Sequence, residues 1–142
     1  MRWFFGKTGL KSQWEGDQLI YGVGKTRGGA IFLVKERNLV IDEACFFLNH
    51  VQMDGGAVYL LDCQHVIVQR CVFFLNFAKW GGGLYMERCS DVKICNNTFL
   101  FNYARRDGGA ISLSQCTDVD LWNNRFILNV GIRSCSNIDI LS

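Results

Sequence analysis

The sequence predicts a right-handed parallel β-helix, and the first observation behind this prediction is a unit of about 27 residues that recurs along the chain. Each copy opens with two glycines and a third small residue. These third residues lie 27, 26 and 27 positions apart, at Ala30, Ala57, Gly83 and Ala110. Each copy closes with the motif F-x-x-N, which begins at Phe46, Phe73, Phe99 and Phe126. Self-similarity at a fixed period of this length indicates a repeat architecture.

The second observation is that apolar residues occupy alternate positions within each unit, which predicts three short strands per coil with one face buried. The first strand has columns at Ile31/Val58/Leu84/Ile111 and Leu33/Leu60/Met86/Leu113. The second has columns at Leu39/Val66/Val92/Val119/Ile138 and Ile41/Val68/Ile94/Leu121/Ile140. The third has columns at Phe46/Phe73/Phe99/Phe126 and Leu48/Leu75/Phe101/Leu128. We expect all these side chains to point inward and equivalent strands of successive coils to pair in parallel.

Other repeat folds do not fit this period. Helical repeats need apolar residues every 3.6 positions, and leucine-rich repeats need their own frame of leucine and asparagine. A propeller blade uses roughly 40 residues or more.

The turns between the strands form columns of their own, the third observation. The chain has no proline, so we expect glycine and asparagine to supply the turns. Stacked asparagines predict a ladder in which each side-chain amide binds the next coil, at Asn49, Asn76, Asn102 and Asn129. Asn97 and Asn124 begin a second ladder. A cysteine ladder is expected at Cys63, Cys89, Cys116 and Cys135, as reduced thiols rather than disulfides, because an in-register column rarely aims its Cβ atoms correctly.

The repeats divide the chain into an N-terminal segment and a series of coils. Residues 1–27 are expected to form a cap or a degenerate first coil, with Trp3, Phe4, Phe5 and Trp14 over the open end of the core. Residues 28–142 form the β-helix, divided as 28–54, 55–80, 81–107, 108–130 and a partial coil at 131–142. The last coil stops partway, which predicts that a protein partner or further repeats cover this end.

Composition limits the function classes. The net charge of +2 gives no reason to expect a nucleic-acid partner. The chain has no run of 18 apolar residues, so no transmembrane helix is predicted. No secretory signal is visible. We therefore expect a cytoplasmic protein if the chain is complete, and a secreted or cell-surface one if it is part of a longer passenger domain.

The GGA[I/V] and F-x-x-N motifs at residues 28–129 resemble the repeats of chlamydial polymorphic membrane proteins, with Gly83 in place of alanine in the third copy. The resemblance implies a surface-exposed adhesin or autotransporter passenger. It departs from that family in lacking a visible signal peptide and a C-terminal barrel. Our leading hypothesis is a non-enzymatic module for adhesion, surface display or scaffolding.

Candidate catalytic residues are few. Asp91 and Asp118 share a column, and paired carboxylates on this fold serve pectin-degrading enzymes as acid and base. The alternative hypothesis is therefore a fragment of a polysaccharide lyase or glycoside hydrolase, with carbohydrate as its ligand. However, Asn38 and Asn137 share that column, which favours a turn-capping role.

No cofactor or metal is predicted. The segment 22–26 imitates a phosphate-binding loop, but Leu19 stands where that motif needs glycine. Cys63, His65 and Cys71 lack the four-ligand spacing of a zinc site.

Outward positions are the remaining anomaly, because apolar residues occupy places that a solvated sheet leaves polar. They lie at Phe47, Phe74, Leu100 and Ile127 in the third strand, and at Phe32, Tyr59 and Tyr85 in the first. Such a stripe is rarely exposed in a monomer. It predicts either an interface with another chain or domain, or a face covered by residues 1–27. The middle strand turns polar instead, through Val40, Ile67, Lys93, Asp120 and Asp139.

Overall fold

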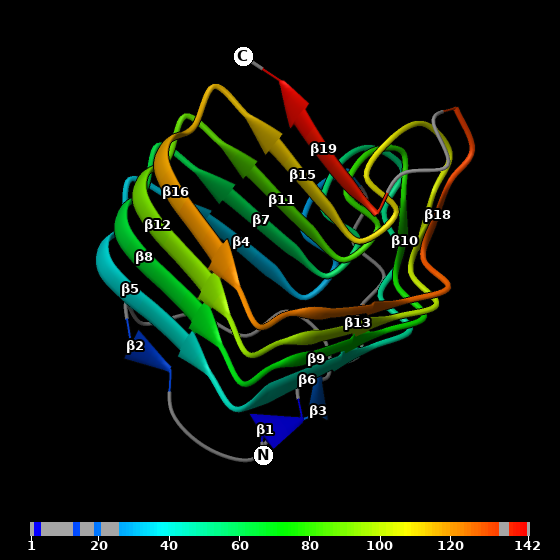
Figure 1. Ribbon diagram of the computed structural model, residues 1–142, viewed down its shortest axis with the longest axis horizontal. Helices are drawn as coiled ribbons and strands as arrows, with labels where there is room; N and C mark the ends of the chain where they lie inside the picture. The colour runs from blue at the N-terminus through cyan, green and yellow to red at the C-terminus, as the bar shows by residue number, and fades with distance from the viewer. Residues whose placement is uncertain (1, 4–12, 15–18, 21–25, 134–136, 142) are drawn as a thin grey trace.

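Stacked parallel strands build the molecule, as Figure 1 shows for the computed structural model. The structure describes residues 2–3, 13–14, 19–20, 26–133 and 137–141. All pairings between the described strands are parallel, and from β4 onward each joins equivalent strands of neighbouring coils; no helix occurs among the described residues. The predicted β-helix of about 27 residues per coil is confirmed.

Three main sheets run along the stack. The first sheet contains β4 (Ile31–Val34), β7 (Val58–Leu61), β11 (Leu84–Glu87), β15 (Ile111–Ser114) and β19 (Ile138–Leu141). The second contains β2 (Gln13–Trp14), β5 (Arg37–Asp42), β8 (Gln64–Gln69), β12 (Ser90–Cys95) and β16 (Thr117–Trp122). The third contains β1 (Arg2–Trp3), β3 (Leu19–Ile20), β6 (Ala44–Phe47), β9 (Val72–Phe74), β13 (Thr98–Leu100) and β17 (Arg125–Ile127).

A fourth, shorter sheet was not predicted. It contains β10 (Phe77–Ala78), β14 (Tyr103–Ala104) and β18 (Val130–Gly131), and it follows the third sheet in each coil. We call the segment from the end of the third sheet to the paired glycines the arm; in the second coil it is residues 75–80. It projects beside the first sheet before the chain returns (Figure 1).

The paired glycines are needed where the arm rejoins the first sheet. Gly55 has a φ of +65°, and a Cβ there would lie 2.3 Å from the carbonyl oxygen of Val58. Gly56 approaches the next coil, so that its Cβ would lie 2.0 Å from the carbonyl oxygen of Gly82. The first glycine therefore supplies a left-handed turn and the second a close backbone approach.

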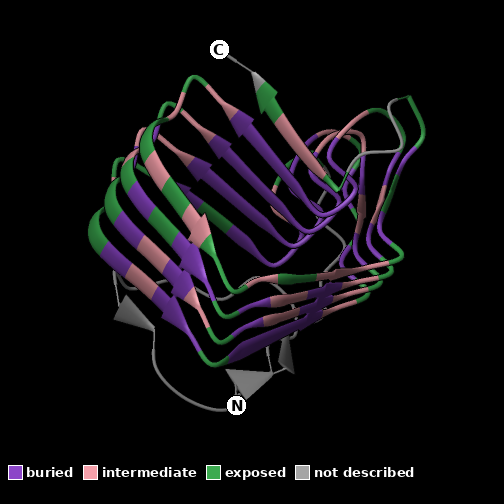
Figure 2. Ribbon diagram, viewed as in Figure 1, coloured by how far each residue is buried: buried purple, intermediate pink, exposed green. Residues whose placement is uncertain are grey.

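The core is a column of side chains inside the coils, shown as buried strand segments in Figure 2. Phe46, Phe73, Phe99 and Phe126 stack with ring centroids 4.7, 4.6 and 5.2 Å apart. Packing loosens toward the C-terminal end, where Val119 and Leu121 are only partly buried. This gradient follows from position in the stack, because the last coil has a neighbour on one side only.

Both asparagine ladders are present in the structure. The Nδ2 of Asn49, Asn76 and Asn102 each donates 2.9 Å to the Oδ1 of the asparagine one coil on. In the second ladder, Asn97 donates 3.1 Å to Asn124 and accepts from the backbone N–H of Cys71 at 2.9 Å. These bonds satisfy backbone groups that the strand ladders leave unpaired at the corners.

The cysteine column contains free thiols. Cys63, Cys89 and Cys116 donate to main-chain oxygens at 3.4–3.6 Å. Cys135 lies outside the described residues.

One predicted column of the third strand is wrong. Leu48, Leu75, Phe101 and Leu128 were expected in the core, but they are 42%, 40%, 41% and 70% exposed. Each has a positive φ, between 48° and 55°. The strand ends before these residues, and the left-handed turn reverses the alternation so that the following asparagine points inward. The turns thus use larger residues as well as the expected glycine and asparagine.

The placement of the last strand is also corrected. Ile138, Asp139 and Ile140 were assigned to the second sheet, but β19 pairs with β15, with Ile138 beside Ile111. This pairing keeps the 27-residue period, which the earlier assignment broke. Asn137 accordingly leaves the column of Asp91 and Asp118, and its main-chain oxygen accepts from Ala110.

The described parts of residues 1–27 add strands at the N-terminal edge. β2 pairs with β5, while β1 and β3 both pair with β6. Through β3, Leu19 lies beside Cys45 and Ile20 beside Phe46. Phe4 and Phe5 lie outside the described residues.

Candidate functional site

The outward residues of the third sheet form the most extended apolar surface. Phe47, Phe74, Leu100 and Ile127 are half-buried, and the rings of Phe47 and Phe74 stack 5.2 Å apart. The described strands of the N-terminal segment extend the sheet edge, and none of them pairs across this face. The outward column that the sequence predicted is therefore present on the described surface.

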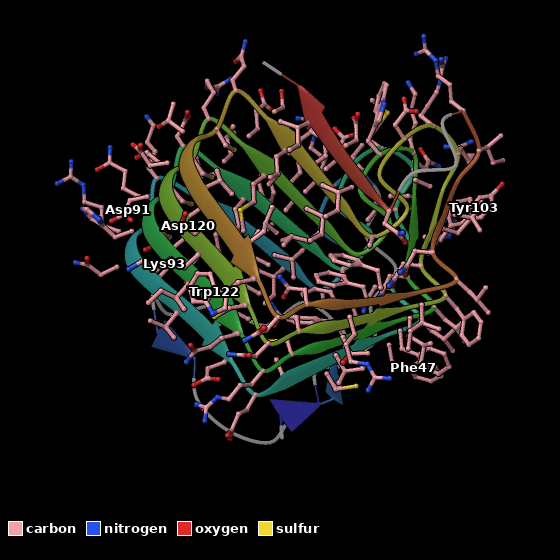
Figure 3. The ribbon with its side chains drawn as sticks, viewed as in Figure 1. Phe47, Asp91, Lys93, Tyr103, Asp120 and Trp122 are labelled. Atoms are coloured by element: carbon pink, nitrogen blue, oxygen red, sulfur yellow. The ribbon has the colours of Figure 1, made fainter. Side chains whose placement is uncertain are left out.

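Two further columns adjoin it around the corner between the third sheet and the arm. The first is the exposed row of Leu48, Leu75, Phe101 and Leu128, and Phe74 reaches it with its ring 6.1 Å from that of Phe101. The second is His50, Phe77, Tyr103 and Val130, in which neighbouring rings lie 4.7 and 5.0 Å apart. Figure 3 shows Phe47 and Tyr103 projecting outward from the two sides of this corner.

We call these three columns the apolar corner. Its middle row was missed because strict alternation placed Leu48 and its equivalents in the core. The signal was present in F-x-x-N itself. Phe46 and Asn49 are three positions apart and both buried, and two residues an odd number apart face the same way only if the chain turns between them.

The predicted aromatic column of the first sheet lies elsewhere and is mostly covered. Tyr59 is fully buried and Tyr85 is 8% exposed, whereas Phe32 is 48% exposed. Tyr59 and Tyr85 were candidates for an interface, but the chain itself buries them, so they present little exposed surface to a partner. The glycine turns at the end of the arm pack against this face. A Cβ at Gly55 would lie 3.1 Å from Tyr59 Cβ, and one at Gly81 would lie 3.1 Å from Tyr85 Cβ.

A polar cluster joins the arm to the first sheet at this place. The Tyr59 hydroxyl donates to the carboxylate of Glu87, and the guanidinium of Arg27 lies 5.2 Å from the Tyr59 ring centre. Arg27 Nε donates 3.3 Å to Oδ2 of Asp54, whose Oδ1 is buried without a partner among the described residues. Burial raises the pKa of Asp54, and burial together with Glu87 raises that of Tyr59. The cluster fixes the arm on the sheet.

The candidate carboxylates Asp91 and Asp118 are both exposed on the outer side of the second sheet. Each has a φ of +51°, as Asn38 and His65 have 55° and 53° in the same column. Asp91 Oδ2 lies 2.5 Å from Nδ1 of His65, and both line a shallow pocket of about 210 Å³. Asp118 does not line this pocket. The shared left-handed φ marks these positions as bends near the start of each second-sheet strand, and aspartate and asparagine adopt this conformation more readily than most residues.

Other outward residues of the second sheet include Lys93, Asp120 and Trp122, which Figure 3 shows pointing away from the core beside Asp91. The predicted change from Val40 and Ile67 to polar residues is present through Asp120. Asp139 belongs instead to the first sheet, where it accepts a 3.3 Å hydrogen bond from Ser112.

Among the described residues, no group of three or more His, Cys, Asp or Glu side chains is placed to hold a metal ion. The glycine-rich segment 22–25 lies outside the described residues. None of the described residues forms a helix long and apolar enough to cross a membrane.

The geometry above defines a parallel β-helix with an apolar outer corner, and comparison with known proteins gives the family. Residues 18–140 match the family described as right handed beta helix region. The chain therefore belongs to the right-handed β-helix family. No curated protein and no solved structure matches it significantly.

Proposed function

We propose that the chain is a non-enzymatic β-helical repeat module that acts in adhesion, surface display or scaffolding. The observation that carries the proposal is the apolar corner, a continuous surface formed by twelve residues from four coils. Its exposed leucines and aromatic rings fit a protein partner better than solvent, because monomers rarely leave contiguous apolar patches of more than a few hundred Å² uncovered. The motif resemblance to chlamydial polymorphic membrane proteins supports a surface role.

The partner we propose for the apolar corner is a second copy of the chain. Eleven of its twelve residues are aliphatic or aromatic, the exception being His50, and none is acidic, so two corners can face each other without burying a carboxylate. The net charge of +2 adds little repulsion between copies. A two-fold arrangement would let each row contact the same surface of its partner.

The test is the hydrodynamic mass of the wild type and of Phe47→Asp plus Phe74→Asp, measured by sedimentation over a range of concentrations. We expect a mass above 16.2 kDa for the wild type and a monomer for the variant, because two carboxylates would be desolvated at the contact. Val40→Asp plus Ile67→Asp is the matched control. It places the same charges on neighbouring coils of the second sheet and should associate as the wild type does.

A wild type that stays monomeric at every concentration contradicts the proposed contact between copies. Equal loss of association in the control places the contact on another face. Circular dichroism of all three proteins separates a lost contact from a lost fold.

A further inference from the structure

The arm contains a pocket of about 520 Å³ that the proposed function does not use. Its lining residues are Gln52, Met53, Lys79, Arg105 and Arg106. Three of the five are cationic and none is acidic. The lining thus has the chemistry of an anion site.

The cations of this pocket differ in their partners from the described arginines that form ion pairs with carboxylates. Three arginines elsewhere hold an aspartate from the neighbouring coil: Arg27 with Asp54, Arg70 with Asp42 and Arg88 with Asp62. Within the described part of the chain, no carboxylate lies within ion-pair distance of Lys79, Arg105 or Arg106. Asp54 is the described carboxylate that interacts electrostatically with Lys79, but it is buried, burial raises its pKa, and it is already paired with Arg27. The pocket charges are therefore left without a fixed counterion.

Neutral groups hold these cations in place. Arg105 donates 2.7 Å to the main-chain oxygen of Gln52, and its guanidinium lies 5.9 Å from the Phe77 ring centre. Lys79 Nζ lies 4.3 Å and the Arg106 guanidinium 6.0 Å from the ring centre of Trp80. Aromatic faces and carbonyl oxygens orient a cation without cancelling its charge. The cluster is therefore positioned and still able to attract an anion.

The coil spacing extends the cluster along the stack. Arg106 N donates to Lys79 O at 2.9 Å, and Arg133 N donates to Arg106 O at 3.0 Å. Lys79, Arg106 and Arg133 thus occupy successive coils, about 4.8 Å apart. A row of charges at this spacing suits a ligand with several anionic groups better than a single small ion.

We propose that this pocket, which we call the anion pocket, binds a small molecule or oligosaccharide that carries two or more sulfate or phosphate groups. Arg105 and Arg106 contact the anionic groups, since a guanidinium matches two oxygens of a sulfate or phosphate. Lys79 and Arg133 contact groups on the adjoining coils. The volume of about 520 Å³ exceeds the needs of one oxyanion and lies in the range of ligand pockets.

The test is titration calorimetry at low salt with three probes, namely sucrose octasulfate, inositol hexakisphosphate and inorganic phosphate. We expect both polyanions to bind at least tenfold more tightly than inorganic phosphate. Arg105→Ala plus Arg106→Ala should weaken polyanion binding at least tenfold, because each charge-assisted hydrogen bond contributes about a factor of ten or more. Lys79→Gln, which removes one charge and leaves a slightly shorter polar side chain, should weaken it less but measurably.

Arg37→Ala plus Arg125→Ala is the charge-matched control. It removes the same two charges from exposed positions of the second and third sheets and should change polyanion affinity by less than twofold. A tenfold preference between the two polyanions would show whether the site favours a sulfated sugar or a phosphorylated ligand, and either preference supports the proposal.

Three outcomes would overturn the proposal: no binding of either polyanion to the wild type, equal weakening in the control, or inorganic phosphate binding as tightly as the polyanions. Phe47→Asp plus Phe74→Asp should bind polyanions as the wild type does. Failure of the anion pocket and failure of the apolar corner are therefore separate results.

Discussion

Asn76 lies in the middle of the asparagine ladder, and its replacement by alanine tests the claim that this ladder stabilises the fold. The side chain is fully buried. Its Oδ1 accepts from the backbone N–H and the Nδ2 of Asn49 at 3.0 and 2.9 Å. Its Nδ2 donates to the main-chain oxygen of Phe46 at 3.0 Å and to Asn102 Oδ1 at 2.9 Å.

Asn76→Ala removes all four of these hydrogen bonds while leaving the backbone in place. Asn102 Oδ1 keeps the backbone N–H of residue 76 as a donor. The backbone N–H of Asn49 loses its acceptor in a site that water does not reach. A buried polar group that loses its partner costs about 1–3 kcal/mol, and at least two such groups are affected. With the small cavity added, we expect the free energy of unfolding to fall by about 3–5 kcal/mol.

The measurement is urea unfolding followed by circular dichroism, with Asn124→Ala as the matched control. Asn124 ends the second ladder and makes equivalent bonds, accepting from Asn97 and donating 2.7 Å to the Ile94 oxygen. It is only half-buried, so water can replace its bonds, and we expect a loss of about 1–2 kcal/mol. Equal losses in the two variants, or a loss below about 1 kcal/mol for Asn76→Ala, would refute the argument that burial makes the ladder stabilising.

Two other perturbations test the packing of the coils. Gly82→Ala should prevent folding or lower stability by several kcal/mol, because its Cβ would lie 2.3 Å from the main-chain oxygen of Gly109. Gly83→Ala should lower stability far less, since alanine occupies that position in the other three coils. Soluble yield and the urea midpoint measure both effects. Burial raises the pKa of the Cys71 thiol to about 12, so the folded state favours the neutral thiol. Its contribution to stability is then complete below about pH 9 and falls as the pH rises toward 12, by about 2 kcal/mol at pH 10.5. Urea midpoints at pH 8 and pH 10.5 should therefore differ less for Cys71→Ala than for the wild type, and an identical difference in both proteins would contradict this assignment.

Periodicity alone determined the fold class. Columns such as Ile31, Val58, Leu84 and Ile111 repeat at the coil length, and a strand with one buried face is the arrangement that stacks them all. The asparagine ladder was predictable for the same reason, because a polar residue at a fixed corner in every coil needs a partner in the next. Repetition carries this information because each coil contacts only its neighbours.

The tertiary structure decided which outward residues are exposed. The alternation in the sequence predicts Tyr59 and Phe74 alike as apolar or aromatic residues on an outer face. The arm packs over Tyr59 and leaves Phe74 at the surface, and alternation within a strand contains no information about which segment covers that strand. The left-handed turn at Leu48 was hidden for a related reason, since the direction of a side chain after a corner depends on a single φ angle.

The anion pocket likewise depends on tertiary structure. Lys79 and Arg106 are one period apart in sequence, which places them in one column. Only the folded arm shows that Trp80 and Gln52, rather than carboxylates, hold the cations of this pocket. The sequence thus determined the stack of coils, because stacking is a periodic property, and the three-dimensional path of the arm decided the surfaces, because coverage depends on contacts between segments that have no common period.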